Sequence, residues 1–504
     1  MGYLHGEYGR FKDYPFMIVH RQTREIVKYL LMIAGGVVLL RLSTVTAYLM
    51  IPMAFIFWMR RKAEYLVFLL MFIASMTVLN TKFFNRDIHF FISARATFFL
   101  GAFFMTVLVS GYHTPQFMYS FFWLYGYMAY IMVVSFAGWM PIISEPKAIL
   151  FLAFIIAFVQ IMIFTTKGWV NFSRIRNFML AICSVYILGS IALIPFPEIG
   201  RSMVAQKMMM WGIDATNEQL IESGLFNGMT WHSQTLGPLL AMLNVYLLSD
   251  YWFNLRQRNK LYWMLLLGVP VMIYYTGSRT ALGGYIFSWI IVLFFSLKGK
   301  GLLRGKKQGL LVVTCTLLMV ACGMILWTEV GRDKSRAFLG KTHESLKSLT
   351  VEDVISSRWG LFERGLEGFR ESPTIGNGFQ VSKEMASFDG GEGLKSLLSA
   401  PIEKGVLGIM ILEEGGIIGI CLFGVFLLVT YWILGTGRYY GYLACFSVML
   451  VLNTGEATFF SISSVGGVCW MVCFIALMMD VERLRSFHNG ASVKERYGYY
   501  PLHE

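Results

Sequence analysis

The chain has 504 residues, of which 56% are hydrophobic and only 14% charged, and its mean hydropathy is +0.59. A soluble protein carries about 25% charged residues, so this composition excludes an ordinary soluble domain. The net charge of +13 does not indicate nucleic-acid binding, because no basic stripe with interleaved aromatic residues lies outside the apolar segments. Basic residues in the short connections of a membrane protein explain the charge instead.

Apolar segments long enough to cross a membrane recur along the whole chain. Runs of roughly 17–25 apolar residues match a hydrocarbon core of about 30 Å, and their backbone polar groups must be satisfied within helices. Residues 1–25 are polar and of mixed charge, so we expect no cleavable signal peptide. We predict about fourteen spans, near residues 26–41, 44–59, 64–81, 96–112, 118–140, 147–164, 178–195, 233–250, 261–275, 280–297, 309–328, 406–433, 439–455 and 463–480.

Clusters of Lys and Arg predict how these spans are oriented. The clusters lie at residues 60–62, 167–176, 256–260 and 298–307, and a cytoplasmic N-terminus places all four of them, with the basic tail, on the cytoplasmic side. Two long loops then lie outside. The predicted parts are N-terminal spans (1–195), a first outer loop (196–232), further spans (233–328), a large outer loop (329–405), and C-terminal spans with a cytoplasmic tail (406–504).

The large outer loop contains a predicted amphipathic helix. Thr350 can cap it, apolar residues recur at helical spacing, and Pro373 follows its end. Arg358 lies within the apolar stripe, where its guanidinium either reaches the surface or meets a buried anion. Residues 376–379, Gly-Asn-Gly-Phe, then predict a tight turn with exposed N–H groups.

Polar residues also lie where the chain enters the membrane. Arg279 follows a very short link between two spans, so it either snorkels to the interface or binds a ligand such as a phosphate. His232 opens a span and titrates near neutral pH, which suits a general base as well as a structural role. Glu403, Glu413 and Glu414 flank the start of the predicted span at 406–433, where carboxylates either accept protons or pair with outer-loop arginines.

Neither the cysteines nor the carboxylates predict a metal or cofactor site. All seven cysteines lie in apolar segments without suitable neighbours, which indicates packing and not a disulfide framework. No Asp-x-Asp type of cluster stands in the outer loops. We therefore expect no cofactor and no dependence on a metal.

Several of these segments resemble motifs of the O-antigen ligase and polymerase superfamily. The resemblance covers residues 231–433, just under half of the chain, and rests on the order and spacing of the motifs. The segments are Trp-His-Ser-Gln-Thr-Leu-Gly at 231–237, Ser-Arg-Thr-Ala-Leu at 278–282, Ser-Arg-Trp at 357–359, Ser-Pro at 372–373, Gly-Asn-Gly-Phe at 376–379 and Leu-Glu-Glu-Gly-Gly-Ile-Ile-Gly at 412–419.

The resemblance implies an all-α polytopic membrane protein, similar to the GT-C membrane glycosyltransferases, with short helices in its large outer loop. Such enzymes act at the outer face of the bacterial inner membrane, in exopolysaccharide, O-antigen or lipopolysaccharide biosynthesis. They transfer a glycan from an undecaprenyl diphosphate donor to a glycan or lipid acceptor. The resemblance implies that Arg279 and Arg358 bind the diphosphate, with Arg364 and Glu414 as supporting candidates, and that transfer inverts the anomeric carbon without a metal.

This chain departs from the family pattern at one position. The family usually has a histidine about nine residues before the glutamate of the motif at 412–419, which we call the re-entry motif. Counting back nine residues from Glu414 gives Gly405. Glu403 and His232 are therefore alternative candidates for the catalytic base, and a role for neither residue is the third alternative. The resemblance does not distinguish a polymerase from a ligase.

The implied partners are the lipid-linked oligosaccharide donor, the acceptor, membrane lipids, and chain-length regulator and flippase proteins. Two other functions stay open, a transporter of polysaccharide or lipid-linked oligosaccharide and a non-catalytic assembly subunit. A transporter is expected to carry charged residues at several mid-span positions around a cavity. Here the informative polar residues cluster at one face of the membrane, with Arg41 as the main exception, which favours an enzyme.

Overall fold

A computed structural model describes residues 14–42, 53, 56, 63–80, 117–166, 171–196, 199, 226–230, 233–254, 260–298, 351–381, 406–455, 458–461 and 465–488. These residues form helices, and their only strand-like pairing is an isolated antiparallel bridge between Leu79 and Thr230. The helices are α1 (Tyr14–Leu42), α3 (Ala63–Met76), α5 (Met118–Ala137), α6 (Pro141–Thr166), α7 (Phe172–Ala192), α9 (Ser233–Ser249), the π-helical turn η2 (Asp250–Asn254), α10 (Lys260–Thr276), α11 (Arg279–Lys298), α14 (Val351–Glu371), α17 (Leu407–Thr436), α18 (Tyr440–Leu452) and α19 (Val465–His488).

The predicted helical membrane class is confirmed by the length and composition of these helices. Within the described residues, six helices are long and apolar enough to cross a membrane, in α5, α6, α7, α11, α17 and α19. Helices α3, α10 and α18 are also apolar but shorter. The predicted spans 44–59, 96–112 and 309–328 lie, almost entirely, outside the described residues. The count of about fourteen therefore stays a prediction.

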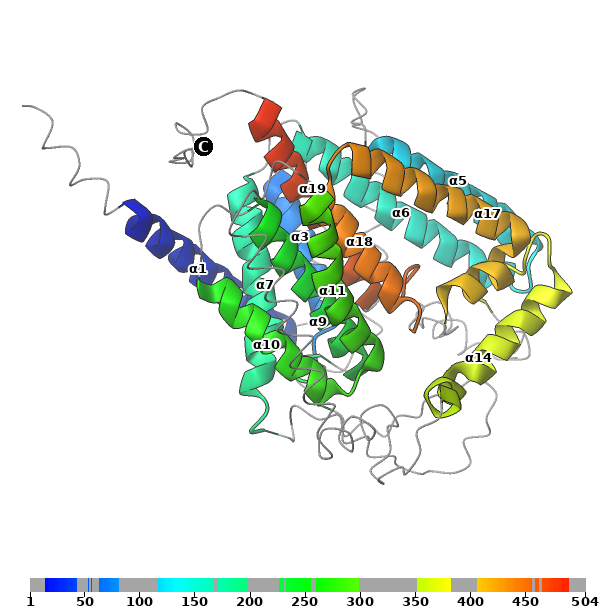
Figure 1. The fold of residues 1–504 in the computed structure, drawn as a ribbon, viewed down its shortest axis with the longest axis horizontal. Coiled ribbons are helices and arrows are strands. Elements are labelled where there is room, and N and C mark those ends of the chain that lie inside the picture. The colour runs from blue at the N-terminus through cyan, green and yellow to red at the C-terminus, as the bar shows by residue number, and fades with distance from the viewer. Residues whose placement is uncertain are drawn as a thin grey trace, which may run out of the picture.

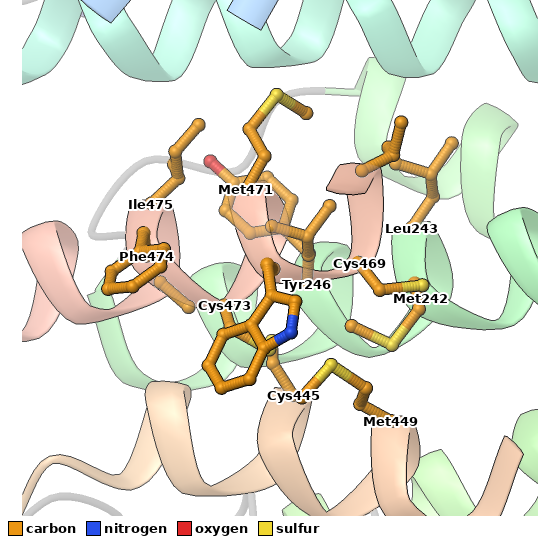
Figure 2. Packing of buried hydrophobic residues seen from close by; sticks show 14 of the residues in the cluster. Met242, Leu243, Tyr246, Cys445, Met449, Cys469, Met471, Cys473, Phe474 and Ile475 are labelled. Carbon is orange, nitrogen blue, oxygen red and sulfur yellow. The ribbon is translucent and has the colours of Figure 1, made fainter. Parts of the chain in front are cut away.

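The centre of the bundle is packed by side chains from α9, α18 and α19. Figure 2 shows Met242 and Tyr246 of α9 facing Cys445 of α18 and Cys469 of α19. These four residues are at most 1% exposed. Cys183, Cys445, Cys469 and Cys473 are buried free thiols, as the packing interpretation predicts, whereas Cys421 is exposed on α17.

Charged residues gather at one end of the bundle, which we call the charged end. Three ion pairs lie there: Arg174–Glu64 at 3.0 Å, Arg176–Asp250 at 3.1 Å and Arg483–Asp480 at 3.0 Å. The first joins the starts of α3 and α7, the second joins α7 to η2, and the third lies within the last part of α19. A longer contact, Arg176–Glu482 at 3.9 Å, joins α7 to α19. The Tyr262 hydroxyl at the start of α10 also donates to Asp250, at 2.5 Å.

The opposite helix ends meet at what we call the motif end. The backbone N–H of Asn80, beyond α3, donates to Met229, just before α9, at 2.8 Å. The N–H of Met229 in turn donates to the Ser190 hydroxyl of α7 at 3.1 Å. The ends of α3 and α7 that lie away from the ion pairs thus meet the segment before α9. Figure 1 shows α3, α7 and α9 side by side in the bundle. The assignment of the charged end to the cytoplasm stays a prediction from the positive-inside rule.

Candidate functional site

The predicted helix of the large outer loop is observed as α14. It ends at Glu371, two residues before Pro373, and lies against the first part of α17 (Figure 1). The contact is close, because a Cβ added to Gly368 would lie 2.8 Å from the Glu413 side chain. Arg364 is partly buried on α14, and the side chain of Arg358, on the same helix, lies outside the described residues.

Helix α17 is bent at the re-entry motif. Gly416 has φ 61° and ψ −160°, and one helical arm of α17 lies before it and a second after it (Figure 1). Such a bend removes the helical acceptors of the N–H groups that follow it. The turn after α14 replaces them, since the N–H of Ile417 donates to Pro373 at 2.9 Å and that of Ile418 donates to Thr374 at 3.2 Å.

The turn at residues 376–379 is paired with the same bend. The N–H groups of Asn377 and Gly378 donate to the carbonyls of Glu413 and Glu414 at 3.0 and 3.1 Å. The predicted tight turn is therefore confirmed, but the expectation that its N–H groups are exposed is wrong. A Cβ at Gly376 would overlap the Glu414 backbone, so the close approach requires glycine. Two motifs that resemble the family thus form one hydrogen-bonded junction, which we call the turn–bend junction (residues 373–380 and 413–418).

Glu414 has a structural partner within this junction. Its side chain is fully buried, and its Oε1 accepts the N–H of Gln380 at 2.9 Å. Gln380 has a left-handed backbone, with φ 49°, which costs free energy for a residue other than glycine. Its carbonyl accepts from Lys147 Nζ at 3.3 Å, and its Nε2 donates to Phe460 at 3.0 Å. Glu414 thus accepts a hydrogen bond from a residue with a left-handed backbone. Its roles as a proton acceptor or as the partner of an arginine stay predictions.

Helices α5 and α6 complete the junction from the other side. The N–H of Phe379 donates to the hydroxyls of Ser144 at 2.6 Å and Ser135 at 3.1 Å. The N–H of Trp139, between the two helices, donates to Asn377 at 3.0 Å. Sequence reasoning missed Ser135, Ser144 and Lys147. Lys147 offered one usable signal, because it is a charged residue at the start of an apolar run.

Arg279 lies at the first residue of α11 and is partly buried. The preceding Gly277 has φ 62°, and the Ser278 hydroxyl accepts the N–H of Ala281 at 3.3 Å, which caps the helix. A Cβ at Gly237 of α9 would lie 2.6 Å from Ser278 Cβ. The structure therefore brings the described part of the first motif, residues 233–237, together with the 278–282 motif at the motif end.

The connection from α18 to α19 contacts both groups of motifs. We use this name for residues 453–455 and 458–461. Gly455 packs directly against Thr280 of α11, and Phe460 accepts the hydrogen bond from Gln380 of the turn–bend junction. Sequence reasoning gave this connection no role. Its small and polar residues between two spans are typical of an ordinary turn.

The two candidate bases, Glu403 and His232, lie outside the described residues. In the described part of the chain, no group of three His, Cys, Asp or Glu side chains is placed to hold a metal ion. The site described here therefore consists of Arg279, the helix start that carries it, and the turn–bend junction.

No protein-family model matches the chain, and no curated protein matches it either. The resemblance of the sequence motifs to a family therefore stays a prediction from the sequence.

Proposed function

We propose that this chain is a membrane glycosyltransferase that polymerises or ligates glycans carried on undecaprenyl diphosphate at the outer face of the bacterial cytoplasmic membrane. One observation carries the proposal. Motifs that resemble the O-antigen ligase and polymerase superfamily, up to 182 positions apart between Gly237 and Gly419 in the chain, gather at the motif end of the bundle. The turn–bend junction pairs two of them, and the start of α11 packs against a third.

The proposed reaction is a direct displacement at the anomeric carbon of the donor. The acceptor hydroxyl oxygen forms the new bond while the bond from the anomeric carbon to the diphosphate oxygen breaks, and the configuration inverts. The diphosphate leaves with the electron pair, and a base, with Glu403 and His232 as the candidates, takes the hydroxyl proton. Arg279 stabilises the charge that develops on the leaving diphosphate, because a guanidinium matches phosphate oxygens with two parallel donors.

The position of Arg279 suits this role. The first N–H groups of a helix lack helical acceptors and carry partial positive charge, which favours anions beside them. Arg279 adds a full charge at the start of the 20-residue helix α11. We propose Arg358 as the second diphosphate ligand from the resemblance alone.

Purified protein in vesicles with a polyprenyl-diphosphate-linked oligosaccharide tests the proposal. A glycosyltransferase forms a new glycosidic bond and releases free polyprenyl diphosphate, measured by mass spectrometry. A transporter moves the donor between leaflets without breaking that bond, and an assembly subunit does neither. Leaflet exchange of intact donor without product would replace the proposal with the transporter.

A further inference from the structure

We propose that the α18–α19 connection positions Arg279 for binding of the donor diphosphate, with Asn453 and Gly455 as its positioning residues. The inference rests on the proposed function and extends it to a segment outside the motifs. The connection acts through Arg279 and is not itself assigned to the reacting atoms. Three observations carry it, from the anchor at Asn453 to the contact with α11.

Asn453 anchors three elements at once. It is fully buried, and its Nδ2 donates to the carbonyl of Met449 at 2.7 Å, at the end of α18. Its Oδ1 accepts the N–H of Phe459 at 2.6 Å, across the connection. Its backbone carbonyl accepts the N–H of Leu407 at 3.0 Å, at the start of α17. The connection is therefore fixed to both α17 and α18.

The far part of the connection is held by side chains from two other elements. Trp470 Nε1 of α19 donates to the carbonyl of Phe459 at 2.7 Å. Gln380 Nε2 donates to the carbonyl of Phe460 at 3.0 Å. Because Gln380 belongs to the turn–bend junction, the connection is tied to that junction at Phe460.

Gly455 places the near part of the connection against α11. Its N–H donates to Leu452 at 3.2 Å, and a Cβ at this position would overlap the Thr280 hydroxyl. Thr280 directly follows Arg279 in the chain. Any added bulk at Gly455 must therefore displace the first turn of α11 or the connection itself.

The connection thus spans the distance between the start of α11 and the turn–bend junction. Recognition of a diphosphate by a guanidinium depends on placement, and a shift of about 1 Å in a catalytic group can cost about 100-fold in rate. The described residues of the connection are uncharged. They add no charge of their own for an anionic donor, and their contact with Thr280 links them to the residue next to Arg279.

The test uses Gly455→Ala with a relieving second change. We expect Gly455→Ala to weaken binding of undecaprenyl diphosphate to the purified protein by at least about tenfold. Thr280→Ala is measured alone as the reference, and we expect the Gly455→Ala/Thr280→Ala double variant to bind as Thr280→Ala does, because the overlapping hydroxyl is gone. Gly424→Ala is the matched control, since a Cβ at Gly424 meets no atom within 4 Å.

A double-mutant cycle separates positioning from general damage to the fold. If Gly455→Ala acts through Arg279, it causes no further loss of affinity in an Arg279→Lys background, whereas independent effects add. Wild-type affinity in Gly455→Ala, a loss that Thr280→Ala does not relieve, or additive losses would each overturn the inference. Wild-type protein that binds the lipid but never releases a glycan product would instead refute the proposed function. The binding measurements on the variants would still test whether the connection positions Arg279.

Discussion

Individual residues at the turn–bend junction have roles that their type alone does not reveal. Glu414 is an acidic residue of a motif that resembles an enzyme family, and a catalytic role is the natural expectation. In the structure it is fully buried and accepts the N–H of the strained Gln380 at 2.9 Å. A buried carboxylate with this partner stabilises a backbone conformation, so we assign it to the geometry of the junction.

Variants of Glu414 test this assignment. Glu414→Gln keeps a side-chain oxygen that can accept from Gln380 and is expected to retain most activity. Glu414→Leu leaves a buried N–H without an acceptor, which costs about 1–3 kcal/mol of folding free energy. Thermal unfolding in detergent and transferase activity measure both effects. Complete inactivity of Glu414→Gln in a stably folded protein would indicate a direct chemical role.

Charge-conserving variants test the two arginines proposed to bind the diphosphate. Lysine keeps the positive charge but lacks the planar fork that matches phosphate oxygens. We expect Arg279→Lys and Arg358→Lys each to lose most activity, about tenfold or more, while membrane insertion is unchanged. Polymer formation in cells and protein abundance in the membrane fraction provide the measurements. If both variants formed polymer normally, the positions of the two arginines would be explained by snorkelling to the membrane interface and not by binding of a diphosphate.

The identity of the catalytic base is a third prediction at this scale. Glu403 stands two residues before the position where the family histidine is expected. His232 is the second residue of the motif at 231–237. We predict that Glu403→Gln abolishes turnover of a lipid-linked donor, and that His232→Gln does so only if histidine is the base. Turnover numbers of both purified variants decide between them. Undiminished turnover in Glu403→Gln removes Glu403 from the mechanism.

At the scale of elements, glycines determine how closely the helices and turns approach. Gly376 and Gly416 both have positive φ, of 81° and 61°, and a Cβ on either would overlap backbone across the junction. The amphipathic pattern predicted α14 correctly, and the turn residues predicted the turn. The pairing of the turn with the bend in α17 was not predictable, because it depends on a tertiary contact and not on local preference.

Alanine variants of these glycines test the junction. Gly376→Ala and Gly416→Ala combine steric overlap with an unfavourable left-handed backbone, which costs about 1–3 kcal/mol each. We expect both to lower the unfolding temperature and to reduce activity. Gly408→Ala, in the same helix α17, is the control, because its Cβ would meet nothing within 4 Å. If all three variants lowered the unfolding temperature and activity equally, the loss would not be specific to the turn–bend junction, and the prediction would be contradicted.

At the scale of the whole molecule, hydropathy predicted the helical membrane class and most helix positions. Arg174 and Arg176, from one of the basic clusters, lie together at the charged end with buried acidic partners. The orientation that the basic clusters predict stays a prediction. Sequence reasoning did not predict that Lys147, Asn453 and Gly455 contact the site. Their contacts join segments far apart in the chain, and hydropathy carries no information on which spans are neighbours.

The central claim is that the arrangement at the motif end transfers glycans from a lipid diphosphate with arginine in place of a metal. The most direct measurement is the release of polyprenyl diphosphate per glycosidic bond formed, by purified protein in excess EDTA. We predict one molecule released per bond, at a rate that chelation does not change and that Arg279→Lys lowers. No release by folded wild-type protein supplied with donor and acceptor, or loss in EDTA that one divalent ion restores, would contradict the account.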